Sequence, residues 1–293
     1  MLSKKYYLLF AILLSLVSVV SYLVKASSAR EQHMGVQLLW KNGELDCQST
    51  FNTDNNKDAW FIEQVQFFIS DIEFQSEDSV WQGAKLVKTP FQTHDTALLG
   101  TNCREVEQKK HAANAGNWQV EFDSDVVIAG SKRMRFTLGV PFERNHLNPI
   151  SQESPLNIPS MFWVWQTGHK FIRLEMASKN AQWLFHLGST GCKSASVMRS
   201  PQQPCRYPNT FTFELPITKT IDNNLTLTLD LAQLLAKVEL SPLTNCQSEQ
   251  DITSCQQLFS NLLLNKQNTD KTNNNPIFNL ANIMPTTKVM TVE

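Results

Sequence analysis

The residue types best able to do chemistry gather between Pro155 and Gly191. This segment holds three tryptophans, two histidines and two methionines in 37 residues, and Trp163 and Trp165 flank a single valine. Methionine thioethers and imidazoles are ligands for soft or borderline metals, copper above all. An intact indole is no such ligand, because its N–H group can only donate. The segment therefore predicts a metal site in which the tryptophans have no obvious role.

Six histidines occur, and for each taken singly an ordinary surface or hydrogen-bonded role is the simpler interpretation. Two stand out by position. His146 lies in an Asn-His-Leu-Asn-Pro turn within a long loop, and His186 ends a predicted strand just before Gly188. Ligands on loops at strand ends can converge at one end of a β-sandwich. His169, at a turn one strand away from the tryptophan pair, could join them, which gives three candidate metal ligands.

Other candidate ligands have plainer interpretations. Methionine fills gaps in cores and a buried indole contributes much apolar area, so core packing is favoured for the methionines and for Trp165. His33 and Met34 could form a separate soft-metal arm. The Asn- and Asp-rich stretch 52–58 resembles a calcium-type oxygen cluster, but it lacks the glycine and terminal glutamate of an EF-hand, so a solvated loop is favoured.

Catalytic motifs are missing from the sequence. It contains no GxSxG, no glycine-rich phosphate loop, no HExxH and no CxxCH for haem attachment. The sequence therefore favours a binding protein over an enzyme.

The first residues read as an export signal. Lys4 and Lys5 precede an apolar run that ends at Val24, and small residues follow. We expect residues 1–29 to be removed as a signal peptide, with a retained membrane anchor as the alternative because the run is nearly long enough to span a bilayer. Cleavage takes the formal charge from −1 to −4, and nothing in that balance suggests a nucleic-acid partner. We expect a periplasmic, secreted or cell-surface protein with no stable membrane span after cleavage.

All six cysteines lie beyond this segment, and an even count in an exported chain predicts disulfides. Two pairs are close in sequence, Cys192 with Cys205 and Cys246 with Cys255. Cys47 with Cys103 is then left by elimination, although fifteen connectivities are possible in principle. A thiolate metal site is disfavoured because CxxC spacing is absent.

The elements expected around these residues are mostly strands. Short β-branched or aromatic runs alternate with turn residues, and Met161–Gln166, Phe171–Ala177 and Trp183–Leu187 read as three successive strands after a long loop, Gly139–Ser160. Asp230 caps a short amphipathic helix, and Asp251–Leu264 repeats that pattern. We therefore predict an all-β, β-sandwich-like single domain over 30–293, with short C-terminal helices, disulfide staples and a mobile loop at 265–275.

Three ordered blocks resemble the signature blocks of the MbnP family, the four-Cys "metallo-mystery pair" proteins found beside MauG-like diheme peroxidases. The blocks are GVPFERNHLNP (Gly139–Pro149), PLNIPSMFWVWQTGHKFIRLE (Pro155–Glu175) and WLFHLGSTGC (Trp183–Cys192). The resemblance covers most of the mature chain. One departure concerns the candidate ligands, since the family usually has tyrosine where this chain has His169.

The resemblance implies an exported copper-binding protein of copper homeostasis. It also implies that Trp163, the first tryptophan of the WxW motif, is oxidised to kynurenine by a diheme cytochrome c peroxidase partner (MauG-like, MbnH-type). Ring opening creates an amine and a ketone with lone pairs, so the modified Trp163 with His146, His186 and His169 would suit Cu(I). The alternative is a disulfide-stapled extracellular interaction module without a metal role.

Overall fold

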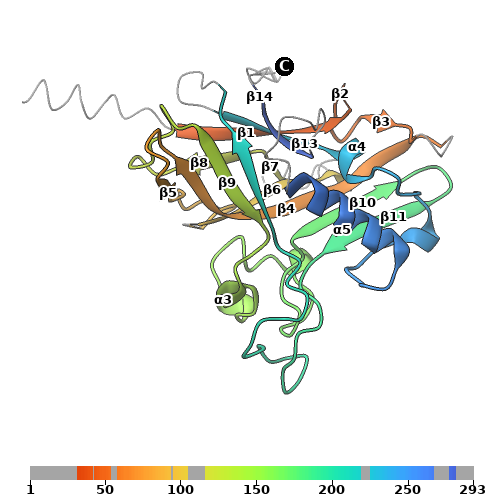
Figure 1. The fold of residues 1–293 in the computed structure, drawn as a ribbon. Coiled ribbons are helices and arrows are strands. Elements are labelled where there is room, and N and C mark those ends of the chain that lie inside the picture. Colours follow the sequence, from red (N-terminus) through yellow and green to blue (C-terminus); the bar gives the residue numbers. More distant parts are fainter. Residues whose placement is uncertain are drawn as a thin grey trace, which may run out of the picture.

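Two β-sheets share one core in this protein (Figure 1). The computed structural model describes residues 32–281 apart from 42, 54–57, 94, 105–115, 219–224 and 267–276. The expected signal peptide and most of the expected loop at 265–275 lie outside the described residues, as does the centre of the Asn- and Asp-rich stretch. The predicted all-β sandwich-like fold is confirmed.

The smaller sheet is built on β1, which pairs in parallel with β13 and antiparallel with β2 and β8. β14 extends it on the outer side of β13. Its strands are β1 (Gln32–Trp40), β2 (Gly43–Glu44), β8 (Gln119–Phe122), β13 (Leu225–Asp230) and β14 (Phe278–Ala281).

The larger sheet is built on β4, which pairs with β10, β6, β9, β3 and β5. β11 extends it beyond β10, β7 beyond β6, and β12 beyond β9. Its strands are β3 (Thr50–Phe51), β4 (Trp60–Gln75), β5 (Trp81–Gly83), β6 (Thr96–Asn102), β7 (Gly116–Asn117), β9 (Arg133–Leu138), β10 (Ile172–Ala177), β11 (Gln182–Leu187) and β12 (Phe211–Pro216).

β4 is a single strand of 16 residues, and its middle is the apolar run from Val65 to Phe74. The strand bends at Asp71, where φ is +51° and the register against β9 shifts between Ser70 and Glu73. A bulge of this kind re-aims a strand without ending it. β4 can therefore pair with β10 and β6 along its first part and with β9 along its second.

Aromatic side chains join the two sheets. Phe278 of the smaller sheet has its ring centroid 6.0 Å from Phe67, 5.2 Å from Phe136 and 4.8 Å from Phe213, all on the larger sheet. Met34 and Met176 are fully buried, so the core interpretation of these methionines is confirmed and Met34 is buried away from any surface metal arm.

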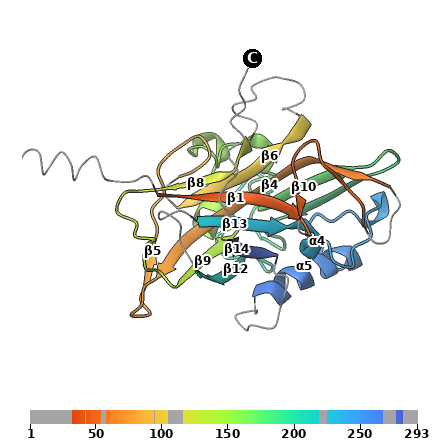
Figure 2. The same ribbon diagram turned by 90° about the horizontal axis from the view of Figure 1, so that it is seen from above.

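Both C-terminal helices are present. Asp230 caps α4 (Leu231–Leu234) by accepting from the Ala232 N–H, and α5 (Thr253–Lys266) lies beside it (Figure 2). Asn261 on α5 donates to the Leu234 and Ala236 carbonyls, which satisfies the end of α4. Among the described residues, no helix combines the length and the apolar character needed to cross a membrane.

Candidate metal site around Trp163

Two long connections protrude together from one end of the sandwich (Figure 1). One leads from β9 to β10 and contains α3 (Phe142–Asn145), and the other leads from β11 to β12. The Gln166 N–H donates to the Val197 carbonyl at 3.1 Å, and the Ser200 hydroxyl donates to the His146 carbonyl. These bonds hold the two connections side by side, as expected for a site at one end of a sandwich.

The predicted strand Met161–Gln166 is wrong. Pro159–Met161 is a 3₁₀ turn, Phe162 makes a single bridge with His169, and the chain turns back between Val164 and Gly168. Gly168 has φ +76°, and a Cβ there would lie 2.4 Å from the Asn145 carbonyl oxygen. The turn therefore depends on this glycine, and the two indoles are not neighbours on one strand face.

Trp163 lies on the backbone of Gly188, just beyond the end of β11. A Cβ added at Gly188 would lie 2.5 Å from Trp163 Cζ3 and 3.0 Å from Cη2, so the six-membered ring fills the space of the missing side chain. Trp163, which is half-buried, therefore packs two residues along the chain from His186.

His186 is buried and its two ring nitrogens have different surroundings. Nε2 lies 3.0 Å from Glu175 Oε1, whereas Nδ1 is buried without a hydrogen-bond partner among the described residues. Burial lowers the pKa of His186, so the ring is neutral at neutral pH. Donation from Nε2 to the carboxylate then leaves the lone pair on Nδ1, the arrangement usual for a metal-binding histidine and its supporting carboxylate.

Glu175 stays ionised in this buried position. Burial alone would raise its pKa, but hydrogen bonds from His186 and from Arg173, whose Nε lies 2.6 Å from Oε1, outweigh it and lower the pKa to about 2. Burial, assisted by the charge of Arg173, lowers the pKa of the nearby Lys170. The Lys170 ammonium and the Arg173 guanidinium both donate to the Ser160 carbonyl. His186 thus lies beside a carboxylate and near the cations Lys170 and Arg173, and Arg104 pairs with the other oxygen of Glu175 at 3.1 Å.

His146 and His169 are brought together around Asn145. The His146 Nε2 lies 3.2 Å from Asn145 Nδ2 and its Nδ1 lies 3.3 Å from the Trp165 carbonyl oxygen. Both His169 nitrogens face carbonyl oxygens, Nε2 that of Leu156 at 2.9 Å and Nδ1 those of Asn145 at 3.2 Å. Burial lowers the pKa of both histidines, that of His169 to about 4.

A model of the family described as MbnP matches residues 31–280. The chain belongs to the MbnP family. A solved structure, "MbnP from Methylosinus trichosporium", resembles it with a TM-score of 0.64 and 20% identity, over 78% of this chain and 87% of that one. No curated protein matches the sequence. At this identity the structural likeness establishes the shared fold.

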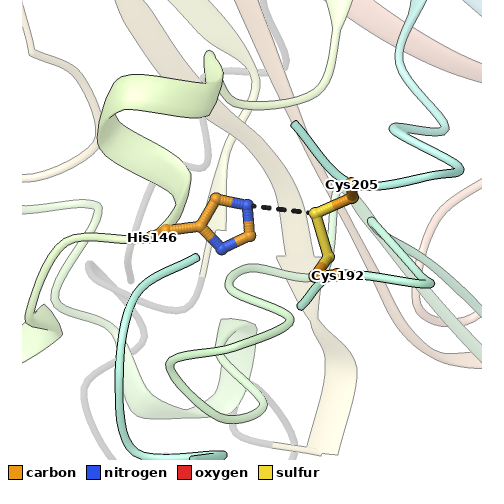
Figure 3. A group of neighbouring side chains, drawn as sticks. All are labelled: His146, Cys192 and Cys205. Carbon is orange, nitrogen blue, oxygen red and sulfur yellow. Dashed lines mark hydrogen bonds between the residues drawn. A yellow bond between two sulfur atoms is a disulfide. The ribbon is translucent and has the colours of Figure 1, made fainter. Parts of the chain in front are cut away.

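The predicted disulfides of this MbnP-family chain are all present: Cys47–Cys103, Cys192–Cys205 and Cys246–Cys255. Two groups of potential ligands in the described residues include cysteines, His146 with Cys192 and Cys205, and Glu249 with Cys246 and Cys255. Their sulfurs are disulfide-bonded and offer no thiolate in this state. Figure 3 shows the first group, in which His146 Nε2 faces Cys205 Sγ at 3.5 Å.

Sequence reasoning placed His186 in the site of this MbnP-family chain but missed Glu175, Asn145 and Gly188. Glu175 could have been found from the sequence, because it is the one acid in the mostly apolar strand IRLEMA. Gly188 and Asn145 could not, since their importance comes from contacts across 25 and 24 residues of chain, with Trp163 and His169 respectively.

Proposed function

We propose that this chain is an exported copper-binding protein, not an enzyme, whose site matures when Trp163 is oxidised to kynurenine. The observation that carries the proposal is the buried Nδ1 of His186, which has no hydrogen-bond partner within the described part of the chain and lies two residues from Gly188, on which Trp163 packs. Membership of the MbnP family supports an association with copper. The three disulfides support a location outside the cytosol.

Maturation supplies the metal-binding lone pairs that the intact indole lacks. Two molecules of hydrogen peroxide, acting through a diheme cytochrome c peroxidase partner, each deliver one oxygen atom and release one water, and together they cleave the C2–C3 bond of the indole to an N-formyl group and a ketone. Hydrolysis then removes C2 as formate and leaves an aryl amine and a ketone. Both groups carry lone pairs. A side chain that could only donate a hydrogen bond therefore becomes a metal ligand beside His186.

The charges around the site favour Cu(I) over a divalent ion. Lys170 and Arg173 both lie near His186, and Glu175 supplies one compensating negative charge. A singly charged cation is repelled less by these groups than a doubly charged one. His146 and His169 both contact Asn145, which donates to the Ser189 hydroxyl of the connection from β11 to β12, and we expect the two histidines to support the site.

Trp163→Phe tests maturation because it keeps an aromatic ring that cannot be opened to an amine. The parent chain and this variant are each produced with and without a diheme partner, and bound copper and the mass of the peptide containing residue 163 are measured. We expect strong copper loading only for the parent with the partner, together with a peptide that has lost a carbon and gained an oxygen. Equal loading of unmodified protein would refute the maturation step.

His186→Gln tests the ligand itself. Glutamine keeps a donor for Glu175 but lacks the imidazole lone pair, so we expect copper affinity to fall by more than the about 10–100-fold that loss of a supporting residue causes. His33→Gln, on β1 of the other sheet, is the matched control and should bind as the parent does. If the two variants bind alike, the chain is better described as an interaction module without a metal role.

A further inference from the structure

We propose that the Cys192–Cys205 disulfide masks a second metal site, which opens when a thiol or dithiol reductant breaks that bond. The ligands are the two freed sulfurs and Nε2 of His146 (Figure 3). Thiolates with an imidazole suit thiophilic cations such as Zn²⁺ and Cu(I). This site uses neither Trp163 nor His186, and it takes as a ligand His146, which we expect only to support the proposed copper site.

The geometry of the oxidised protein already matches one edge of such a site. All three ligand atoms lie within 4.8 Å of one another, and His146 Nε2 is 3.5 Å from Cys205 Sγ. Metal–sulfur and metal–nitrogen bonds of ~2.3 and ~2.05 Å at a tetrahedral angle place the two ligands ~3.5 Å apart. After reduction only the Cys192 sulfur has to move, to the ~3.8 Å that separates two thiolates on one ion.

His146 is held ready for this role. Its Nδ1 faces the Trp165 carbonyl oxygen at 3.3 Å, and its ring packs on Phe142 with centroids 4.9 Å apart. A backbone carbonyl that accepts from one nitrogen fixes the lone pair on the other, which here is Nε2. Asn145 Nδ2 donates toward His146 Nε2 and also to Ser189 Oγ, at 3.3 Å. The amide therefore keeps a hydrogen-bond partner when His146 Nε2 binds a cation instead.

The surroundings allow reduction and favour thiolates. Cys192 is partly buried between the exposed Gly191 and Lys193, and Cys205 keeps 6% of its surface exposed, whereas Cys246 and Cys255 are both at 0%. Lys193 and Arg206 each follow one of the two cysteines, and nearby cations favour the ionised thiol. In the exchange the reductant becomes a disulfide and delivers two electrons and two protons to the protein sulfurs. The incoming cation then displaces those protons.

Cobalt absorption tests the proposal directly. Protein made without a diheme partner is treated with a dithiol under native conditions, and alkylation with peptide mapping identifies the freed cysteines. Co²⁺ is then added, and thiolate-to-cobalt charge-transfer absorption is recorded and competed with Zn²⁺. We expect free Cys192 and Cys205, a new absorption band at one ion per chain, and no band before reduction.

Three variants separate this site from its rivals. Cys192→Ser combined with Cys205→Ser should abolish the band, His146→Gln should weaken Co²⁺ binding about tenfold or more, and His186→Gln should leave it unchanged. The proposal is overturned if the folded protein resists the dithiol, if freed thiols give no band, if the double serine variant keeps it, or if His146→Gln binds as tightly as the parent. Loss of the band in His186→Gln would show that the cobalt site depends on His186, and it would also refute the proposal.

Discussion

At the scale of single residues, hydrogen bonds decide which histidine can bind a cation. His186 donates to an ionised carboxylate, and no described residue bonds its Nδ1. His146 has one amide donor near its lone pair, and His169 faces carbonyl oxygens on both sides. Three imidazoles that look equivalent in the sequence therefore differ in what they can do. Their shared burial lowers the pKa of all three, so the folded protein holds them neutral.

This neutrality predicts a loss of stability in mild acid. The pKa of His169 falls from 6.5 to about 4 on folding, so its contribution is complete above pH 6.5 and is lost as the pH falls toward 4. The shift corresponds to about 3 kcal/mol of unfolding free energy for this residue. We expect urea unfolding of His169→Gln to show a difference between pH 7 and pH 4 that is smaller than in the parent by about that amount.

The remaining pH dependence should come from His146 and His186, whose pKa values are also lowered, and near pH 4 from Glu175, whose folded carboxylate stays ionised while the unfolded one takes up a proton. Comparison with His33→Gln controls for the loss of one imidazole as such. An unchanged pH dependence in His169→Gln would show that His169 is not the buried neutral group described here.

At the scale of elements, the antiparallel pair β10–β11 builds the site. Its register pairs Arg173 with His186, so Glu175 lies diagonally across from His186 within reach of its ring. The strands themselves were predictable, because Phe171–Ala177 and Trp183–Leu187 are short, mostly apolar runs bounded by turn residues. The Glu175–His186 pair was not, since register between strands follows from tertiary packing and not from local pattern.

The false strand at Met161–Gln166 has a physical explanation. Its apparent alternation came from aromatic residues that are only half-buried on a protruding loop, so the pattern did not report a sheet face. The left-handed conformation of Gly168 then closes a turn where a strand would continue. The sequence shows that residue 168 is glycine. It does not show that Asn145 comes so close that a larger residue would not fit.

Gly188→Ala tests how this element places Trp163. The added methyl would lie 2.5 Å from the Trp163 ring and 2.7 Å from the His169 carbonyl oxygen, so both the ring and that backbone must move. We expect a loss of about 1–3 kcal/mol in unfolding free energy, as for overpacked cores, and slower oxidation of Trp163 by the diheme partner.

The measurements are urea unfolding and the fraction of oxidised Trp163 peptide with time. Gly83→Ala is the matched control, because a Cβ added at Gly83 would have no atom within 4 Å, and its effect should stay within about 0.5 kcal/mol. Oxidation of Gly188→Ala at the parental rate would show that contact with Gly188 does not position the ring.

At the scale of the whole molecule, the disulfides join parts of the chain that the sheets alone leave separate. Cys47 follows β2 of the smaller sheet and Cys103 follows β6 of the larger sheet, so their bond ties the two layers together. Cys192–Cys205 closes the base of one protruding connection, and Cys246–Cys255 anchors the start of α5 near β11. The pairing of the six cysteines is predictable from short spacing and elimination. Which parts of the fold each disulfide joins is known only from the order of the strands in the two sheets.

Loop length predicts an order for the stability that the disulfides confer. The separations are 56 residues for Cys47–Cys103, 13 for Cys192–Cys205 and 9 for Cys246–Cys255. Chain entropy then gives losses of about 4, 3 and 2.6 kcal/mol when each bond is removed by paired Cys→Ser substitution. Urea unfolding at neutral pH should follow this order, with the Cys47–Cys103 variant the least stable because it also frees one sheet from the other. If the Cys246–Cys255 variant is the least stable instead, packing of its fully buried sulfurs beside β11 outweighs the constraint on the unfolded chain.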